Sequence, residues 1–326
     1  MLKFPSTAGP LAAAHLERLQ ESLERHDEHK KAFYDRTAEL REKLLEEIRS
    51  ARDALLREMF ILAGLDGPES GALGEIAEEI RRYNRFCDWA VFDLVALAAC
   101  LPFPPPEIAA ALAPRLLIFH AFRIGDDVVD DHEDYKRGAP TALGNLRRSV
   151  AVRDAAQVAN LLSCFMMVFE AAGRLDLGDR RLALHTLAGA LRESLPAARR
   201  TLADYRRMVD GKMVCYAFLI YRPAVERLAV PAATRAAFER FLKRSFFLAQ
   251  IANDLVDLED DQARRQPNYW TLPWEPGRAA AEFLSRLGWL SDACRRFEGD
   301  LGDYAHSRVA DLLRYTLQVS EEDRED

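Results

Sequence analysis

Apolar and polar residues recur along most of this chain with the period of an amphipathic α-helix. The first such stretch, residues 11–63, is rich in Leu, Ala, Glu, Arg and Lys and contains no Gly or Pro. It predicts one long helix or two successive amphipathic helices. Its charged residues are interpreted as the solvated face of a helix packed on the domain, with a projecting coiled-coil arm as the alternative. No segment keeps the strict alternation of a β-strand, so the pattern predicts an all-α protein.

Glycine and proline divide the rest of the chain into further predicted helices. The clearest break is Pro102–Pro106, since proline lacks a backbone N–H and a helix cannot cross this run. The remaining helical patterns cover residues 75–101, 107 into a first acidic cluster, 150–172, 180–194, 198–221, 231–262, 277–289 and 290–318. We expect an N-terminal helical segment (1–70), packed on or extending from one large α-domain (71–320), and a charged tail (321–326).

Composition narrows the class of protein. The chain has 326 residues, 49% of them hydrophobic and 30% charged, which is ordinary for a globular protein large enough to enclose a cavity. A net charge of −7 and the lack of a basic stripe argue against nucleic-acid binding. The sequence contains no apolar run of about 18 residues, so we expect no membrane span, and no secretory signal is recognised. The five scattered cysteines form no CxxC pair, which is typical of reduced thiols in the cytoplasm.

Two carboxylate clusters follow directly after the most apolar stretches of the chain. Asp126, Asp127 and Asp130 follow residues 116–122, and the second cluster, Asn253–Asp261, follows residues 246–252. Unpaired buried carboxylates are costly, whereas bound divalent cations would make such clusters favourable. On helices, Asp126 and Asp130 are one turn apart, and Asn253, Asp257 and Asp261 share one face at i, i+4 and i+8. The sequence therefore predicts two acidic helix faces that hold Mg²⁺ against a diphosphate.

The order of these motifs resembles the superfamily of trans-polyprenyl diphosphate synthases and class I terpene synthases, over about residues 80–275. Residues 126–130 are similar to its first aspartate-rich motif, and Lys136–Thr141 to the Arg-Arg-Gly-x-Pro-Thr element that follows it. Tyr205–Lys212 is similar to the segment whose lysine holds the allylic diphosphate, and Gln250–Asp257 to the second aspartate-rich motif. The resemblance implies an isoprenoid-synthase (terpenoid synthase) helical barrel around a central apolar cavity.

It also implies a site. The metal would be Mg²⁺, with about three ions bound and Mn²⁺ as an alternative. The implied metal ligands are Asp126, Asp127, Asp130, Asn253, Asp257 and Asp261. An allylic prenyl diphosphate is the implied substrate, bound by Arg137, Arg207, Lys212, Arg314 and Tyr315, with catalytic roles for Arg207 and Lys212. Residues expected to line the cavity, where aromatic faces would stabilise a carbocation, are Phe92, Phe119, Phe122, Tyr216, Phe218, Phe246, Phe247 and Gln250.

Departures from the family pattern favour one of the activities found in the superfamily. Prenyl synthases that add isopentenyl diphosphate carry a Gly-Gly-Lys-Arg-x-Arg-Pro element upstream, and of Tyr83–Trp89 only Arg85 matches it in charge. The second motif begins with Asn253 and resembles the terpene-synthase triad Asn-Asp-Leu-x-Ser-x-x-x-Glu. A terpene synthase (cyclase) that releases diphosphate is therefore the first expectation.

Two alternatives stay open. The first is a prenyltransferase acting on isopentenyl diphosphate or another acceptor, because the prenyl-synthase elements Lys136–Thr141 and Lys212 are retained. The second is an inactive partner subunit of a synthase, against which the two intact acidic clusters argue. A homodimer is the expectation that the family carries.

Overall fold

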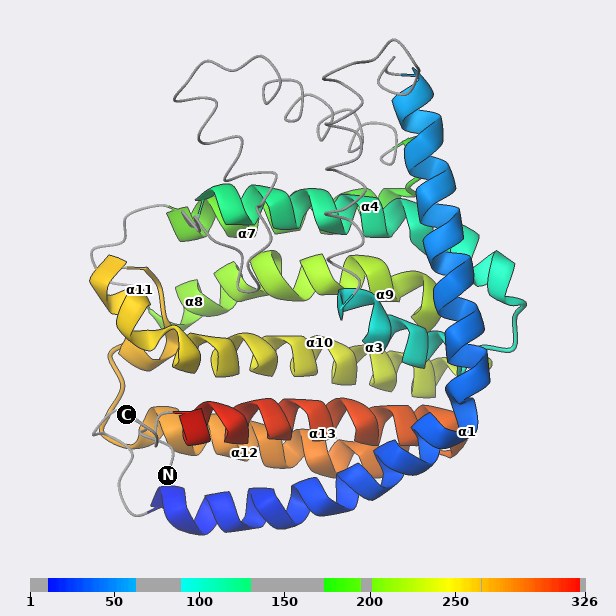
Figure 1. Cartoon of the computed structure of the whole chain (residues 1–326). Helices are drawn as coiled ribbons and strands as arrows, with labels where there is room; N and C mark the ends of the chain where they lie inside the picture. The colour runs from blue at the N-terminus through cyan, green and yellow to red at the C-terminus, as the bar shows by residue number, and fades with distance from the viewer. Residues whose placement is uncertain (1–10, 63–88, 130–172, 195–200, 265, 323–326) are drawn as a thin grey trace. The chain divides into compact units, whose positions relative to one another are not determined.

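The computed structural model describes residues 11–62, 89–129, 173–194, 201–264 and 266–322. Every element in these ranges is helical, which confirms the predicted all-α class. No helix among them is both long enough and apolar enough to cross a bilayer. The elements, labelled in Figure 1, are α1 (Leu11–Leu62), α3 (Trp89–Ala98), α4 (Pro105–Val129), α7 (Leu177–Ser194), α8 (Leu202–Val209), the π-helical η1 (Asp210–Cys215), α9 (Tyr216–Glu226), α10 (Ala232–Val256), α11 (Leu258–Arg264), the 3₁₀ turn η2 (Tyr269–Thr271), α12 (Arg278–Ala293), the 3₁₀ turn η3 (Cys294–Arg296) and α13 (Gly299–Glu322).

The chain forms two compact units. The first contains Met1–Ala38, Leu182–Phe218 and Val225–Asp326, and the second contains Glu39–Arg181 and Leu219–Ala224. Helices α1, α7 and α9 contribute residues to both units. The second aspartate-rich motif belongs to the first unit, and the first motif belongs to the second unit.

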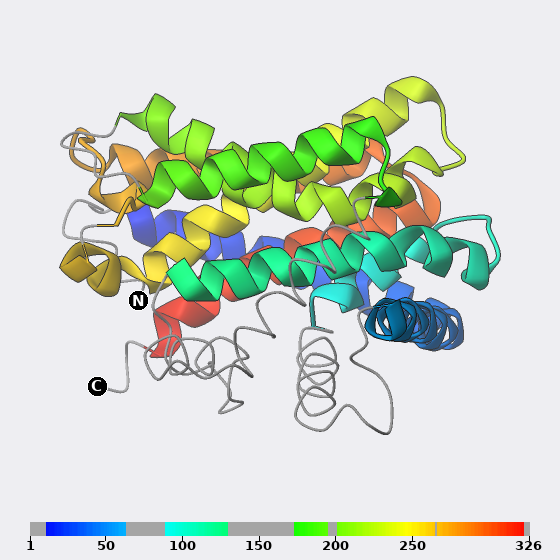
Figure 2. The same ribbon diagram turned by 90° about the horizontal axis from the view of Figure 1, so that it is seen from above.

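Helix α10 is the core helix of the first unit. It contacts α12, α13, η1 and η2, and the three long helices α10, α12 and α13 of this unit run side by side (Figures 1 and 2). Its buried side chains lie around most of its circumference, as expected for a helix packed on several sides. Phe238 and Phe241 stack with ring centroids 5.9 Å apart, and both rings contact Phe297 edge-on. These aromatic contacts fix α10 at the position from which its acidic end is presented.

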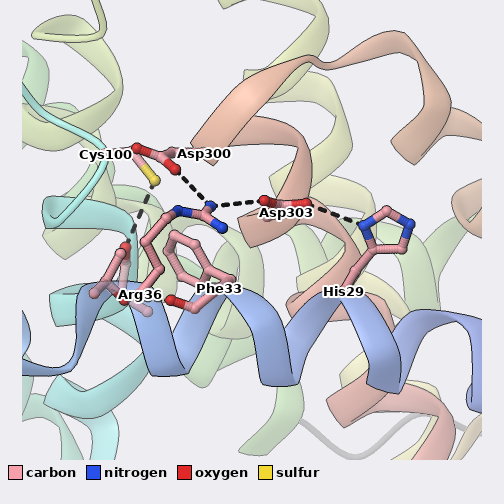
Figure 3. A network of polar contacts seen from close by, with 8 residues as sticks. His29, Phe33, Arg36, Cys100, Asp300 and Asp303 are labelled. Atoms are coloured by element: carbon pink, nitrogen blue, oxygen red, sulfur yellow. Dashed lines mark hydrogen bonds and ion pairs between the residues drawn. The ribbon is translucent and has the colours of Figure 1, made fainter.

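The N-terminal part of α1 packs on α13 through a network of exposed charges (Figure 3). Arg36 donates to Asp300 and to Asp303, each over 2.7 Å, and His29 Nδ1 lies 3.0 Å from a carboxylate oxygen of Asp303. One exposed ion pair contributes only about 0–1 kcal/mol. Two of these contacts share Asp303 and two share Arg36, so they restrain one another and the network fixes the alignment of the two helices.

In the second unit, a buried carboxylate joins three helices. Asp179, in the first turn of α7, is fully buried and accepts hydrogen bonds from Arg115 of α4 and Arg222 of α9. Asp176 accepts from the backbone N–H of Asp179 over 2.9 Å, which is the contact of an N-cap residue. A hydrogen bond from Arg222, 2.5 Å long, lowers the pKa of Asp176 to about 2. Two arginines around one buried aspartate leave no uncompensated negative charge there.

The predicted helix over 231–262 is divided in the structure. Helix α10 ends at Val256, and Asp257 has φ −88° and ψ 9°, outside the helical region. Backbone hydrogen bonds continue across the break, from Asp257 N to Asn253 O over 3.1 Å and from Asp261 N to Asp257 O over 2.8 Å. The three motif residues therefore still lie on successive turns, although Asp261 belongs to α11.

Two other predicted helix ends are wrong. Pro223 was expected to stop a helix at 221, but α9 continues to Glu226 with Pro223 buried inside it. Buried neighbours on both sides keep this segment helical despite the missing N–H. The break expected between residues 289 and 290 lies further along, because α12 continues to Ala293 and α13 begins at Gly299. Gly299 has φ 58°, a conformation that favours glycine, so it makes this turn possible.

Candidate diphosphate and metal site

The second acidic motif sits at the C-terminal end of α10, where three of the predicted metal ligands come together. Asn253, Asp257 and Asp261 are all half-buried. The Asn253 amide donates to Asp257 Oδ2 over 2.6 Å. This contact places the side chains of Asn253 and Asp257 on one side of the helix end, and Asp261 follows on the next turn.

Tyr315 of α13 joins this group. Its hydroxyl donates to Asn253 Oδ1 over 3.1 Å. Burial, helped by the negative charge of Asp257, raises the pKa of Tyr315 to about 12, so the phenol remains a neutral donor at physiological pH. Arg314, the other half of the predicted Arg-Tyr pair, instead donates to Asp27 over 2.5 Å and lies 3.5 Å from Asp311. Of this pair, Tyr315 contacts the motif and Arg314 pairs with other carboxylates.

Asp254 faces the protein interior and organises the motif from behind. It accepts hydrogen bonds from Tyr205 (2.7 Å), Gln250 (2.7 Å) and the backbone N–H of Tyr269 (2.8 Å). Burial raises the pKa of Asp254 to about 7, although the three donors favour its ionised form. Gln250 was expected to line the cavity, and in the structure its amide holds this carboxylate.

Asn268 is a further component of the site. It is fully buried, and its amide nitrogen donates to Asp254 O over 2.5 Å and to Asp261 Oδ2 over 2.8 Å. No role was predicted for Asn268, Tyr205 or Tyr269 from the sequence. Their positions after or before the motif carry no periodic signal, and only the buried location of Asp254 among apolar residues hints that it needs donors.

Arg207 and Lys212 are the two basic residues with predicted catalytic roles. Arg207 lies in α8, just before the π-helical segment η1, and Lys212 lies within η1. Arg207 of α8 has a side chain that is 66% exposed, and it pairs with Asp204 over 2.5 Å. Asp204 forms a capping box with Thr201 at the start of α8. The hydrogen bonds from Thr201, followed by the one from Arg207, lower the pKa of Asp204 to about 2. Lys212 lies in η1, a π-helical turn of the kind often found at functional sites.

A close approach of two backbones fixes the position of η1. A Cβ atom added to Gly189 of α7 would lie 2.1 Å from the backbone nitrogen of Lys212. One added to Gly211 would lie 2.5 Å from the carbonyl oxygen of His185. Only glycine permits this contact, so the glycine pair determines where the Lys212 backbone lies.

The aromatic candidates differ in their surroundings. Phe119 and Phe247 are buried, and Phe247 contacts the ring of Tyr205 edge-on with centroids 6.3 Å apart. Two other buried rings are already covered by cations, since Lys243 lies 4.4 Å from the Phe218 centroid and Arg308 lies 4.9 Å from that of Phe246. Tyr216 is half-buried, whereas Phe92 on α3 is 51% exposed. Arg286 likewise lies 5.8 Å from the Phe247 centroid, so neither burial nor cation contact singles out one of these rings as the wall of a cavity.

The first aspartate motif lies largely outside the described residues. Asp126, Asp127 and Phe122 belong to α4, but their side chains are outside the described part of the chain. Asp130 and Arg137 also fall outside it. Their roles remain predictions from the sequence.

The oxygen atoms of the second motif suit Mg²⁺, which prefers hard ligands such as carboxylate and amide oxygens. Asp257 accepts from an amide and forms no ion pair with a basic side chain in the described ranges. In the same ranges, no three acidic, histidine or cysteine side chains are arranged to hold a metal ion by themselves. The described motif therefore has the right donors for one side of a metal site.

Comparisons with known proteins identify the fold. Neither family profiles nor curated sequences match the chain. An FPP/GFPP synthase from Zymomonas mobilis is structurally similar, with TM-score 0.59 and 19% identity over 84% of this chain and 99% of the other. A decaprenyl diphosphate synthase from Rhodobacter capsulatus gives 0.55 and 16% over 89% and 99%. A polyprenyl synthase from Caulobacter crescentus, complexed with calcium and isoprenyl diphosphate, gives 0.55 and 13% over 84% and 97%. The predicted isoprenoid-synthase fold is confirmed.

Proposed function

We propose that this chain, which has the fold of the trans-polyprenyl diphosphate synthases, is a trans-prenyltransferase that couples an allylic prenyl diphosphate to isopentenyl diphosphate or another acceptor. The fold carries the proposal, since prenyl synthases align with 84% to 89% of the chain. A terpene synthase is the first expectation from the sequence motifs. The structural neighbours favour the alternative, because all three are named as prenyl or polyprenyl synthases.

The proposed metal ligands are Asn253, Asp257 and Asp261 together with Asp126, Asp127 and Asp130. When bound, Mg²⁺ neutralises the negative charge that develops on the diphosphate as the carbon–oxygen bond breaks. Mn²⁺ meets the same ligand preference. The Caulobacter crescentus synthase is complexed with calcium and isoprenyl diphosphate, which supports a divalent cation in the proposed site.

Basic side chains would stabilise the leaving diphosphate by charge-assisted hydrogen bonds. Arg207 is suited to this role because its side chain is largely exposed, so exchanging the Asp204 contact for a phosphate oxygen costs little. Lys212, Arg137 and Tyr315 complete the proposed set. Arg314 would have to leave Asp27 before it binds a phosphate.

A terpene synthase is the second candidate, and one contact favours it. Tyr315 donates to Asn253, so the residues that resemble the terpene-synthase triad and the C-terminal Arg-Tyr pair meet in this structure. In this alternative the allylic cation would lose a proton or react with water, and no acceptor diphosphate would be needed. The upstream segment also favours a terpene synthase, because only Arg85 matches in charge the element with which prenyl synthases bind isopentenyl diphosphate.

Product analysis separates these candidates. Purified protein with Mg²⁺ is incubated with geranyl, farnesyl or geranylgeranyl diphosphate, each with and without isopentenyl diphosphate. The proposed function predicts an elongated diphosphate that forms only when isopentenyl diphosphate is present. A volatile hydrocarbon or alcohol formed without it would establish the terpene synthase. No product from any pair would favour the inactive partner subunit or a different acceptor.

We also propose a homodimer in the cytoplasm. Leu177, Leu184 and Leu187 are 67%, 67% and 49% exposed on α7, spaced seven and three residues apart as along a coiled-coil seam. A second copy of the same helix would cover such a seam symmetrically. Cys100, Cys215 and Cys294, the cysteines whose side chains are described, form no disulfide, which is compatible with a reducing compartment.

A further inference from the structure

The chain that follows α11 folds back onto the end of α10. This strap, defined here as residues 266–274, is held by hydrogen bonds at several points. Trp270 Nε1 donates to Ile251 O over 3.0 Å, and the backbone N–H of Tyr269 donates to Asp254 Oδ2 over 2.8 Å. Within the strap, Trp274 Nε1 donates to Tyr269 O over 2.9 Å. The strap is therefore fixed against α10 and does not form an independent loop.

Asn268 connects the strap to the second motif. Its Oδ1 accepts from the backbone N–H of Trp270 over 2.9 Å, which sets the orientation of the amide, because a backbone N–H requires an acceptor. The Nδ2 group must then face Asp254 O (2.5 Å) and Asp261 Oδ2 (2.8 Å). Both ends of this buried amide are satisfied, so its position is rigid.

The break at Asp257 explains why Asp261 needs such a contact. Asp261 lies on the short helix α11, which contains only Leu258–Arg264 and contacts α10 in the described structure. A carboxylate on a short helix beyond this break is not held by a long helix in the way that Asn253 is held within α10. Groups that hydrogen-bond a ligand from outside the coordination sphere orient it, and their loss weakens metal binding.

We propose that Asn268 is a positioning residue for divalent-cation binding, which holds the Asp261 carboxylate in line with Asn253 and Asp257. The inference rests on the proposed function, since it takes these three residues as ligands. It assigns a role to the strap, which the motifs of the sequence did not include. The strap thereby supplies a hydrogen bond that orients the Asp261 carboxylate, from a residue 7 positions further along the chain.

Calorimetric titration of inorganic pyrophosphate at increasing Mg²⁺ concentrations tests this role without turnover. Asn268→Ala should raise the Mg²⁺ concentration at half-maximal binding by about tenfold, the size expected when an outer partner of a metal ligand is lost. Thr271→Ala is the matched control. Its hydroxyl donates to Asn268 O over 3.0 Å within the strap and does not contact Asp261, so the midpoint should stay within about twofold.

Asn268→Asp and a double-mutant cycle separate positioning from a general loss of structure. Aspartate keeps the size of the side chain and the acceptor for Trp270, but it places an oxygen against Asp261, so its midpoint should also rise by about tenfold. In an Asp261→Ala background, Asn268→Ala should have no further effect on the midpoint. A persistent shift in that background would overturn the proposal, as would failure of both Asn268 variants to fold.

The outcome for the wild type keeps the two claims apart. If wild-type protein binds pyrophosphate with Mg²⁺ and the Asn268 variants keep the same midpoint, the positioning role is wrong and the proposed function stands. If wild-type protein binds no pyrophosphate in Mg²⁺, the proposed function fails and the positioning role fails with it.

Discussion

His26 is the residue whose environment has the clearest consequence for stability. It is a buried residue of α1 that contacts α12 and α13, since its Nε2 lies 2.7 Å from Ser291 Oγ of α12 and its ring centroid lies 4.7 Å from that of His306 of α13. Burial, with the neighbouring imidazole of His306, lowers the pKa of His26 to about 3. Because the unfolded chain binds a proton near pH 6.5 and the folded chain does not, stability is lost as the pH falls below about 6.5.

His26→Gln tests this linkage, since glutamine keeps a partner for Ser291 but does not titrate. Between pH 7.5 and pH 5 the wild type should lose about 2 kcal/mol more unfolding free energy than the variant. Urea denaturation at both pH values measures the difference. His185→Gln, at an exposed histidine of α7, is the control. Equal losses for wild type and His26→Gln would contradict the linkage.

At the same scale, sequence reasoning found the residues of the site that follow a helical spacing. Asn253, Asp257 and Asp261 were identified because they recur every four residues, and Tyr315 through its resemblance to a motif. Asp254 was identified only as part of the second aspartate-rich motif, and two of the donors that satisfy it, the Tyr205 hydroxyl and the Tyr269 backbone N–H, were missed. Those partners come from α8 and from the strap, so only tertiary structure brings them to Asp254.

At the scale of the elements, the contact between α7 and η1 depends on two glycines. Gly189→Ala would place a Cβ atom 2.1 Å from Lys212 N, so the two backbones must separate. We expect a loss of about 1–3 kcal/mol in unfolding free energy, the usual cost of overpacking. Gly288→Ala in α12 is the control, since its Cβ would meet nothing within 4 Å, and it should stabilise by up to about 1 kcal/mol. Equal stability of the two variants in urea denaturation would rule out the close contact.

Helix existence was predictable at this scale, and helix ends were less so. The periodic patterns located α1, α7, α10, α12 and α13, because each buries one or more apolar faces. The break at Asp257 was not predictable, since the carboxylate spacing continues across it. The continuation of α9 through Pro223 was missed for the opposite reason, because burial of the neighbouring residues outweighs the lost N–H.

At the scale of the whole molecule, the exposed leucines of α7 predict the oligomeric state. Leu184→Glu would place a charge in the proposed seam, so the protein should change from twice the 36.9 kDa chain mass to a monomer. Light scattering after size-exclusion chromatography measures this. Ile61→Glu on α1 is the control, because Ile61 is also 60% exposed but lies outside the seam. A wild type that elutes as a monomer would exclude the homodimer.

The resemblance to prenyl synthases identified the fold, because the order of two acidic motifs with a lysine segment between them is distinctive. The activity was harder to predict. Features of both prenyltransferases and terpene synthases occur in this one sequence, and the upstream segment around Arg85 departs from the prenyl-synthase pattern. The structural neighbours favour prenyl transfer, whereas the Tyr315 contact with Asn253 is the detail that keeps cyclisation as the second candidate.

The central claim is that both acidic motifs together hold Mg²⁺ against an allylic diphosphate. Calorimetric titration of farnesyl thiolodiphosphate, which ionises too slowly to react, measures the affinity of this site for an allylic diphosphate directly. The account predicts tight binding that requires Mg²⁺ and is lost in Asp126→Ala and in Asn253→Ala, while circular dichroism shows unchanged helicity. Binding of equal strength in EDTA, or binding that survives both substitutions, would contradict it.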